Sequence, residues 1–376
     1  MMALKQPIKR DVHLDLLRLA SMFMIVFLHS IDHSGVIENI TKHGGVYSSI
    51  YVYFCYALVQ ICVNCYVLLS GYFLVTSRFK LHKLIFLWIE VVFYALLFKL
   101  VFMLFGGTPF SLASLISCFV PILTGRYWFI TIYFGMYLIS PFLNMAIRAM
   151  NKYQHAVLNL VLCLLFSVWS SLHPSIKGMN SGGGWGLAWF VVLYFVGAWL
   201  RLYYVPNYKV GRKCFLWLLI PTLMTTVFLG SKALDVPIIT RIAKNWFSYN
   251  SLPVYLATVV FFLLFLNLRS KNTLSISVFQ RFISYISPLT FGVYLIHAHA
   301  NVSPWLWETS HLALYTQSPY FPLMQFGIVS VIFCGCLLMD AGRSWLFSKL
   351  EHSHAVAEKC DGITQWCSKK IRKLIK

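Results

Sequence analysis

The chain has 376 residues, of which 59% are hydrophobic and only 11% are charged. Soluble domains carry about 25% charged residues, so this composition excludes a water-soluble protein and predicts one that crosses a membrane many times. The net charge of +20 does not indicate nucleic-acid binding, because the basic residues alternate between successive loops and are not gathered on one soluble domain.

Apolar segments long enough to cross a bilayer, which takes about 20 helical residues, occur ten times along the chain. They predict an all-α polytopic membrane protein whose spans cover residues 12–31, 48–74, 84–105, 126–145, 155–172, 186–204, 214–231, 251–269, 282–300 and 321–340. Gly and Pro interrupt the segment 106–122, so we expect a re-entrant or interfacial piece there. The ten cysteines are divided between spans and loops and do not form a disulfide framework.

The distribution of Lys and Arg predicts the orientation of the chain. If the N-terminus is cytoplasmic, the cytoplasmic segments hold 23 of these residues and the outer segments hold 6. Because cytoplasmic loops carry the excess, we expect both termini in the cytoplasm. Residues 1–340 are then the membrane domain. The tail 341–376 mixes aromatic with basic residues, and is either an amphipathic helix on the anionic inner leaflet or a solvated extension.

Two polar residues lie inside the first predicted span, Arg18 near its inner end and His29 towards its outer end. Eleven helical residues make about three turns, so both side chains lie on one face, roughly 16 Å apart along the axis. An arginine at the bilayer centre costs about 2.5–3.5 kcal/mol on insertion scales, and such residues usually serve a ligand, a pathway or a partner charge. Pairing of Arg18 with Asp15, three residues away, is the structural alternative.

Five segments together resemble motifs of the membrane-bound acyltransferase-3 family. Within this family, the chain is most similar to the surface-polysaccharide O-acyltransferases of bacteria. The first is the spacing of Arg18 and His29, and the others are similar to later motifs of the family. These are Leu69-Ser70-Gly71-Tyr72-Phe73-Leu74 followed by Arg78 and Lys80, Arg126-Tyr127-Trp128-Phe129 with Tyr137-Leu138-Ile139-Ser140-Pro141-Phe142-Leu143-Asn144, Tyr194-Phe195-Val196-Gly197, and Thr290-Phe291-Gly292-Val293-Tyr294-Leu295-Ile296-His297.

The resemblance implies acyl transfer from a cytoplasmic acyl-CoA, with acetyl-CoA the first expectation, to a hydroxyl of a cell-surface polysaccharide or its lipid-linked precursor. It also implies a location in the bacterial cytoplasmic membrane, with no metal. His29 is then either the general base for the acceptor hydroxyl or a nucleophile that carries the acyl group. Arg18 would hold a phosphate or the pantetheine amides of CoA. Extended pantetheine spans roughly 15 Å, which matches the distance to His29.

Two carboxylates complete the expected catalytic set. Asp32 lies three residues beyond His29 and either orients the imidazole or is a solvated carboxylate at the helix end. Glu90, at the middle of the third span, must face the bundle interior. It either meets Arg18 or His29 or belongs to a structural pair. Lys99, in the same span, is expected to extend towards the outer interface.

The other expected site residues follow from the motifs. Arg78 and Lys80 would bind the anionic end of CoA, with Ser70 and Tyr72 nearby, although topology explains the cations and helix packing explains Ser70 and Tyr72 equally well. Trp128, Tyr294 and His297 are expected to contact the acceptor. The alternatives are an interfacial belt for Trp128 and packing for His297.

Glycine-rich outer segments, including Ser181-Gly182-Gly183-Gly184-Trp185, are either loops that fold over the acceptor or flexible links. A different class of function, a transporter that exports a glycan or a small solute, would also contain buried Arg, His and Glu. Loss of acyl-CoA turnover on replacing His29 would distinguish an acyltransferase from such a transporter. The sequence fixes neither the acyl group, nor the acceptor, nor the oligomeric state.

Overall fold

The computed structural model describes residues 11–107, 109–173, 181–268, 278–351 and 362, and within these ranges every regular element is a helix. Seven of the described helices are long and apolar enough to cross a membrane, namely Val12–Asp32, Val46–Leu74, Leu81–Leu104, Trp128–Ala149, Lys152–Leu172, Tyr208–Ala233 and Phe321–Ser348. Two shorter apolar helices are Leu187–Tyr203 and Leu252–Leu268. These nine correspond to nine of the predicted spans, and the all-α polytopic class is confirmed.

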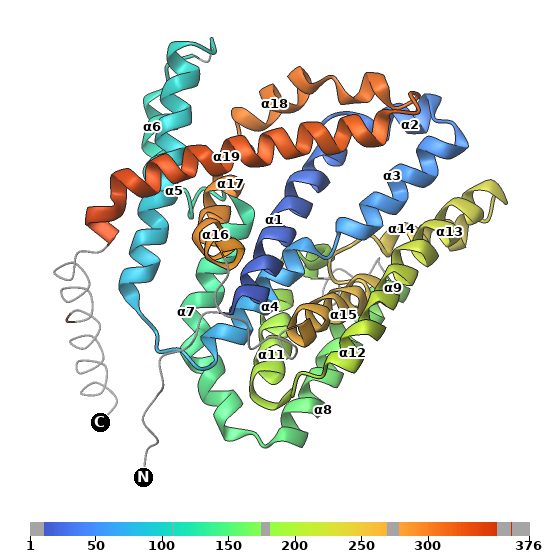
Figure 1. Ribbon diagram of the computed structural model, residues 1–376, viewed down its shortest axis with the longest axis horizontal. Helices are drawn as coiled ribbons and strands as arrows, with labels where there is room; N and C mark the ends of the chain where they lie inside the picture. Colours follow the sequence, from blue (N-terminus) through green and yellow to red (C-terminus); the bar gives the residue numbers. More distant parts are fainter. Residues whose placement is uncertain (1–10, 108, 174–180, 269–277, 352–361, 363–376) are drawn as a thin grey trace.

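The helices follow one another with short connections (Figure 1). Their bounds are α1 Val12–Asp32, α2 Val36–His43, α3 Val46–Val59, α4 Cys62–Leu74, α5 Leu81–Leu104, α6 Leu112–Phe119, α7 Trp128–Ala149, α8 Lys152–Cys163, α9 Trp169–Leu172, α11 Leu187–Tyr203, α12 Tyr208–Lys213, α13 Leu219–Ala233, α14 Pro237–Asn245, α15 Leu252–Leu268, α16 Val278–Ile286, α17 Thr290–His297, α18 Val302–Ser310 and α19 Phe321–Glu351. A π-helical turn, Leu164–Val168, joins α8 to α9.

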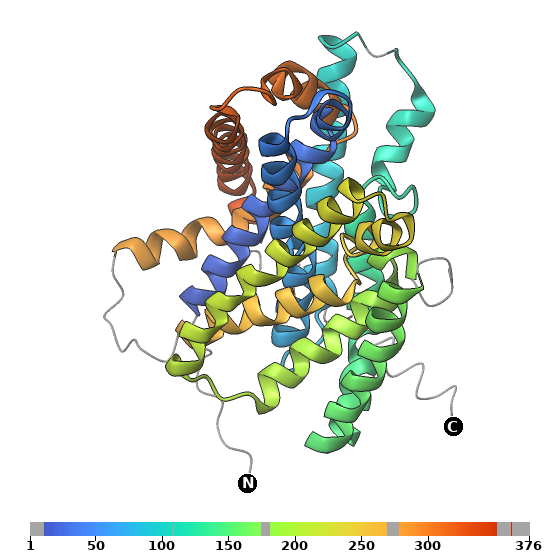
Figure 2. The same ribbon diagram turned by 90° about the vertical axis from the view of Figure 1, so that its right-hand side faces the viewer.

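The first helix lies in the middle of the bundle (Figures 1 and 2). Its N-terminus is capped by Asp11, whose carboxylate accepts a hydrogen bond from the backbone N–H of His13 at 3.2 Å. It packs against α3, α4, α15, α16, α17 and α19. Because neighbours surround α1, its polar residues face protein and cavities, which is how charged side chains are tolerated inside a membrane.

Residues 282–300 do not form the single span that the sequence predicted. They are divided into α16, a 3-10 turn Ser287–Leu289 and the eight-residue α17. Pro288 lies in the turn, and Ser287 is held there because its hydroxyl donates to the Asp15 carboxylate of α1 at 3.0 Å. The break fixes the start of α17, the helix that ends at His297. The eight-residue α6 lies within 106–122 and is too short to span, as predicted for that segment.

Helices α4 and α11 approach each other closely through two glycines of the motif segments. A Cβ atom on Gly71 would lie 2.4 Å from the carbonyl oxygen of Tyr194, and one on Gly197 would lie 2.4 Å from that of Leu68. Small residues at such a crossing let two backbones pack together in a membrane protein. Gly197 therefore fixes the position of the α4 segment that carries Ser70 and Tyr72.

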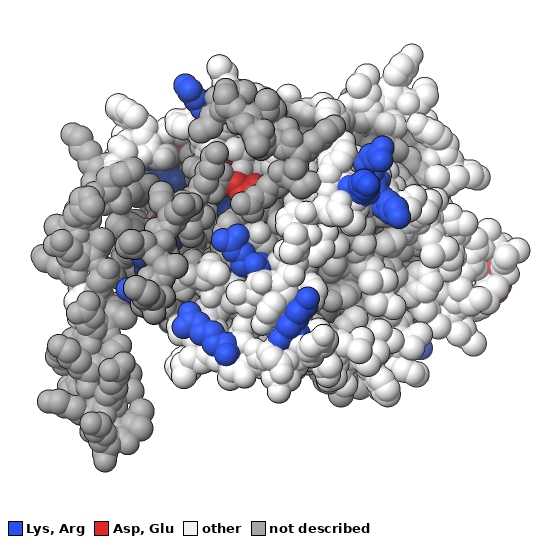
Figure 3. All heavy atoms as spheres, turned by 60° about the horizontal axis from the view of Figure 1, so that its bottom comes forward, with Lys and Arg blue, Asp and Glu red and all other residues white. Residues whose placement is uncertain are grey.

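The last helix, α19, crosses α1 and continues eleven residues beyond Asp340, the predicted end of the membrane domain. The remainder of the predicted tail 341–376 lies outside the described residues, apart from residue 362. Figure 3 shows the face on which α1 begins, with separate groups of Lys and Arg side chains and little acidic surface. This face is the one that the charge distribution predicts to be cytoplasmic.

Candidate active site

Two histidines from distant parts of the chain meet at the far end of α1. The Nδ1 atom of His29 lies 3.0 Å from the Nε2 atom of His297, the last residue of α17. His297 is fully buried, whereas His29 is partly accessible. The ring of His33 lies beside that of His29, with 5.0 Å between the ring centroids. The site thus holds three neighbouring imidazoles, two of which share a hydrogen bond.

The hydrogen bonds of the pair assign the tautomer of each neutral ring. The Nδ1 atom of His297 contacts the carbonyl oxygen of Val293, and because a carbonyl only accepts, Nδ1 must carry the proton. The Nε2 atom of neutral His297 is then an acceptor, so His29 donates to it from Nδ1. The Nε2 atom of His29 is left with its lone pair available, which is the state that a general base or nucleophile requires.

This geometry changes the roles that the sequence suggested for Asp32 and His297. The nitrogen of His29 that an orienting carboxylate would contact is occupied by His297. Asp32 instead interacts with the phenol of Tyr56 in α3. His297 thus occupies the position behind His29 that a carboxylate has in a catalytic triad. Burial lowers the pKa of His33 from its usual range, which favours a neutral ring beside His29.

A cavity of about 920 Å³ opens at the N-terminal end of α1. Its walls include Arg18, Ser70 and Tyr72, which were all predicted to bind the acyl donor. Lys83 and Arg201 add two further cations to the lining. Against these three cations stand the carboxylates of Asp11 and Asp15, so the cavity suits a large anionic ligand that brings its own negative charge.

Arg18 is held in place and still faces this cavity. Its guanidinium donates to Asp15 at 3.3 Å and to the hydroxyl of Ser287 at 3.1 Å. The pair with Asp15 is the structural alternative that the spacing suggested, and it is present. The side chain of Arg18 nevertheless remains 29% exposed, so several of its N–H groups stay available to a ligand.

Two contacts between aromatic rings connect the cavity to the histidine pair. Phe129 and Thr290 lie in its lining. The ring of Phe129 lies 6.0 Å from that of Tyr294, and Tyr294 lies 6.2 Å from His297. Tyr66 closes the same wall, where its hydroxyl bridges the Arg18 carbonyl and the Thr290 hydroxyl. The three residues that the sequence assigned to the acceptor, Trp128, Tyr294 and His297, therefore form one contiguous path through Phe129.

Residues 11–341 match the family model described as "Acyltransferase domain". The chain belongs to the acyltransferase-3 family. The match covers nearly the whole membrane domain, as the five motif segments indicated. No curated protein and no solved structure matches the chain. The protein is thus a multi-pass membrane acyltransferase, and the histidine pair with its adjoining cavity is its candidate active site.

Two of the cations predicted to bind the donor do not line the main cavity of the acyltransferase. Arg78 lies in an adjoining cavity of about 280 Å³ that also contains Arg148 and shares Leu74 and Ser77 with the larger one. The backbone N–H and carbonyl of Lys80 both bond to the hydroxyl of Tyr137. Lys80 therefore anchors the turn between α4 and α5, and its side chain lines neither cavity.

Glu90 forms an ion pair within the bundle, which is the second of the two alternatives that the sequence left open. Its carboxylate lies 3.1 Å from Arg343, which also binds Asp340 at 2.6 Å. The hydroxyl of Tyr94 donates to the same Asp340 at 2.7 Å. This buried cluster joins α5 to α19, so Glu90 has the structural role that the sequence left open. Its partner could not be foreseen because Arg343 lies beyond the predicted membrane domain.

Sequence reasoning missed Arg201, which was counted only as a topological charge. In the structure its guanidinium lies 5.0 Å from the centre of the Tyr72 ring and 3.4 Å from the Tyr72 hydroxyl, at the wall of the main cavity. No local signal distinguishes Arg201 from other arginines at inner helix ends, because its role depends on the close packing of α11 on α4.

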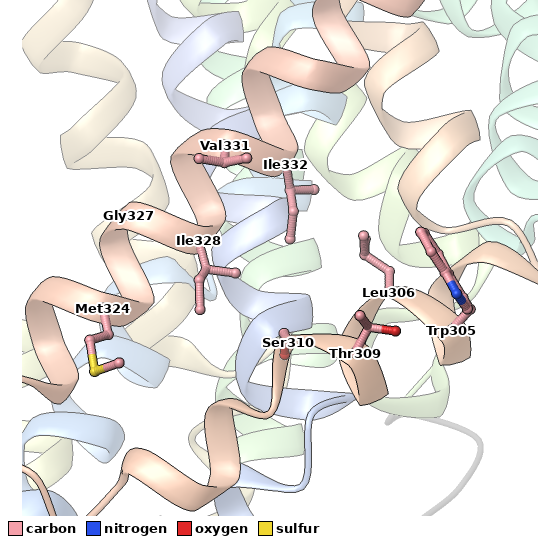
Figure 4. Close-up of a pocket in the computed structure, with 9 residues that line it drawn as sticks. All are labelled: Trp305, Leu306, Thr309, Ser310, Met324, Gly327, Ile328, Val331 and Ile332. Carbon is pink, nitrogen blue, oxygen red and sulfur yellow. The ribbon is translucent and has the colours of Figure 1, made fainter.

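A separate groove of about 440 Å³ lies between α18 and α19 (Figure 4). Its lining includes Trp305, Ile328 and Ile332, and contains no titratable side chain. This groove lacks the chemistry of an acyltransferase centre. In the part of the chain that the structure describes, no group of three or more His, Cys, Asp or Glu side chains is arranged so that it could hold a metal ion.

Proposed function

We propose that this acyltransferase transfers an acyl group from an acyl-CoA, in the simplest case acetyl-CoA, to a hydroxyl of a cell-surface polysaccharide or of its lipid-linked precursor. The observation that carries the proposal is the arrangement of the site. A cavity with three cations is connected through the rings of Phe129 and Tyr294 to the histidine pair, in which Nε2 of His29 has a lone pair that can accept a proton or an acyl group. In keeping with the charge distribution, the cavity opens to the cytoplasm of a bacterium and the protein lies in its cytoplasmic membrane.

The lining of the cavity suits the charge of the donor. Arg18, Lys83 and Arg201 would pair with the phosphates of CoA, because guanidinium and ammonium groups are the usual protein partners of phosphate. The pantetheine arm, roughly 15 Å long when extended, would then run along α1 past Arg18. This length would carry the thioester beyond Arg18 towards His29, which lies roughly 16 Å further along α1.

Two routes of transfer are compatible with the tautomers. In the first, Nε2 of His29 takes the proton of the acceptor hydroxyl while the oxygen attacks the thioester carbon. The C–S bond breaks, and the proton passes from Nε2 to the CoA thiolate. In the second, Nε2 itself attacks the thioester carbon and CoA leaves as the thiolate. The Nδ1 proton of the acylated ring moves to His297, and this charge balances the thiolate. The acceptor hydroxyl then attacks the acyl-imidazole and gives its proton to the CoA thiolate, while His297 returns its proton to Nδ1 of His29 as the C–N bond breaks.

The proposal is tested on the envelope glycans of the host. A strain that lacks the protein is complemented with wild type, with His29→Ala and with His173→Ala, which replaces an exposed histidine at the end of α9. Mass spectrometry of the polysaccharides should show one acyl mass lost in the deletion strain. Wild type and His173→Ala should restore it, and His29→Ala should not. Identical acyl content in all strains would refute the proposed function.

A further inference from the structure

The glycine-rich segment before α11 has a defined conformation in the structure. Four consecutive residues have left-handed backbones, with φ of 48° at Ser181, 62° at Gly182, 73° at Gly183 and 91° at Gly184. Glycine adopts this region without the clash that a Cβ atom causes. At Gly184 a Cβ atom would also lie 2.8 Å from the backbone nitrogen of Asn250. The segment is therefore folded tightly against the residues before α15, unlike a flexible link.

This fold places Trp185 on two other aromatic rings. The Trp185 ring lies 4.2 Å from that of Trp128 and 5.8 Å from that of Tyr249. Trp128 and Tyr249 are 6.2 Å apart and inclined by only 22°. Trp185 remains 50% exposed, whereas Tyr249 behind it is buried. We call these three residues the aromatic platform.

A chain of ring contacts connects the platform to the histidine pair. Trp128 lies next to Phe129, which contacts Tyr294 and through it His297. The phenol of Tyr249 interacts electrostatically with Asp32, Tyr56 and Tyr294, which surround the outer end of α1. Burial raises its pKa well above the usual value, so this phenol keeps its proton as a hydrogen-bond donor. The exposed ring of Trp185 is thus connected to His29 through the rings of Trp128, Phe129, Tyr294 and His297.

The chemistry of the platform suits a sugar ring. One face of a pyranose presents C–H groups, and these pack against the electron-rich face of an aromatic ring. The phenol of Tyr56 and the carboxylate of Asp32, which interact with Tyr249 of the platform, offer partners to sugar hydroxyls. The nucleotide of the donor needs cations for its phosphates, and Arg18, Lys83 and Arg201 line the other cavity. The acceptor is therefore the substrate that the platform fits.

We propose that Trp185 stacks on a sugar ring of the acceptor, supported by Trp128 and Tyr249, and so aligns the acceptor hydroxyl with Nε2 of His29. This assignment rests on the proposed function and adds to it the residue that binds the acceptor. The assignment also explains the left-handed backbone of Ser181–Gly184, because this backbone places the Trp185 ring against the Trp128 ring.

The test uses the full-length protein in lipid nanodiscs, with acetyl-CoA as donor and de-O-acylated polysaccharide from the host envelope as acceptor. Trp185→Phe keeps an aromatic face, and Trp185→Leu keeps apolar bulk without one. Trp305→Leu is the matched control, since Trp305 is 55% exposed but lies in the groove between α18 and α19 (Figure 4). Thermal melting confirms that each variant is folded.

Stacking predicts that Trp185→Leu raises KM for the polysaccharide about tenfold, a factor typical of one aromatic contact. Trp185→Phe should stay within about threefold of wild type by the same scale, and KM for acetyl-CoA should not change. An unchanged polysaccharide KM in Trp185→Leu, an equal loss in Trp305→Leu, or a change confined to acetyl-CoA would overturn the assignment while leaving the proposed function standing. Failure of wild type to acetylate the polysaccharide would overturn both.

Discussion

His297 provides the sharpest test of how the site is organised, because sequence and structure give it different roles. The motif suggested contact with the acceptor, whereas the structure places His297 behind His29, bonded to its Nδ1 atom at 3.0 Å. His297→Leu removes the acceptor of that bond, and the leucine side chain still fills the fully buried position. His297→Gln retains a carbonyl oxygen that accepts from His29 and an amide that donates to Val293.

The size of the effect follows from the charge that His29 gains. When Nε2 accepts a proton or an acyl group, the bond from Nδ1 becomes charge-assisted, and such bonds contribute about 1.5–3 kcal/mol. Since about 1.4 kcal/mol corresponds to a factor of ten in rate, His297→Leu should lower kcat about 10- to 150-fold. His297→Gln should recover part of this loss. KM for acetyl-CoA should stay unchanged, because His297 does not line the donor cavity.

The assay is acetyl-CoA turnover by nanodisc-reconstituted protein at varied donor and acceptor concentrations. A His297→Leu enzyme whose kcat stays within about threefold of wild type would refute the orienting role on this energy scale. A change found only in the KM for the acceptor would instead support the substrate-binding role that the motif suggested.

Three further predictions concern the donor cavity and the packing around it. Arg201→Ala should raise KM for acetyl-CoA about 10- to 150-fold, because one phosphate contact is lost. The control Arg212→Ala, at an exposed position, should leave this KM unchanged. The same KM in Arg201→Ala as in wild type would exclude Arg201 from the donor site. Glu90→Gln should destabilise the fold by about 1.5–3 kcal/mol, measured by thermal melting, while kcat of the folded fraction stays unchanged. A lower kcat at unchanged stability would instead support a catalytic role for Glu90. Gly197→Ala should lower the free energy of unfolding by about 1–3 kcal/mol, because the added methyl group overpacks against Leu68. Gly230→Ala should not lower it, because a Cβ atom there has no neighbour within 4 Å. Similar melting temperatures for the two variants would contradict the close contact between α4 and α11.

The arrangement of spans could be predicted from the sequence because bilayer thickness imposes a length and hydrophobicity on each helix. The prediction failed at 282–300, where composition resembles a span but Pro288 and the bonds of Ser287 to α1 break the helix. Hydropathy averages over such a break. Only the tertiary contact to Asp15 reveals why the chain turns there, and that turn is what brings His297 to His29.

The candidate site was predictable where residues lie on one helix. The spacing of Arg18 and His29 fixes their common face, and the structure places Arg18 in the cavity and His29 at the histidine pair. Contacts between helices were not predictable, because pairing of His29 with His297, of Glu90 with Arg343, and of Tyr72 with Arg201 depends on which helices become neighbours. The motif segments contain His29, His297 and Tyr72 but not Glu90, Arg343 or Arg201, and other motif residues pack helices, as Gly71 and Gly197 do.

The central claim is that His29 performs the transfer, and the most direct measurement is the single-turnover rate of acyl transfer to host polysaccharide by the His29→Ala enzyme saturated with acetyl-CoA. Removal of a general base or a nucleophile predicts a fall of at least about 100-fold with donor affinity unchanged, because the donor cavity does not include His29. A His29→Ala enzyme that transfers the acyl group within a few-fold of the wild-type rate would contradict the account.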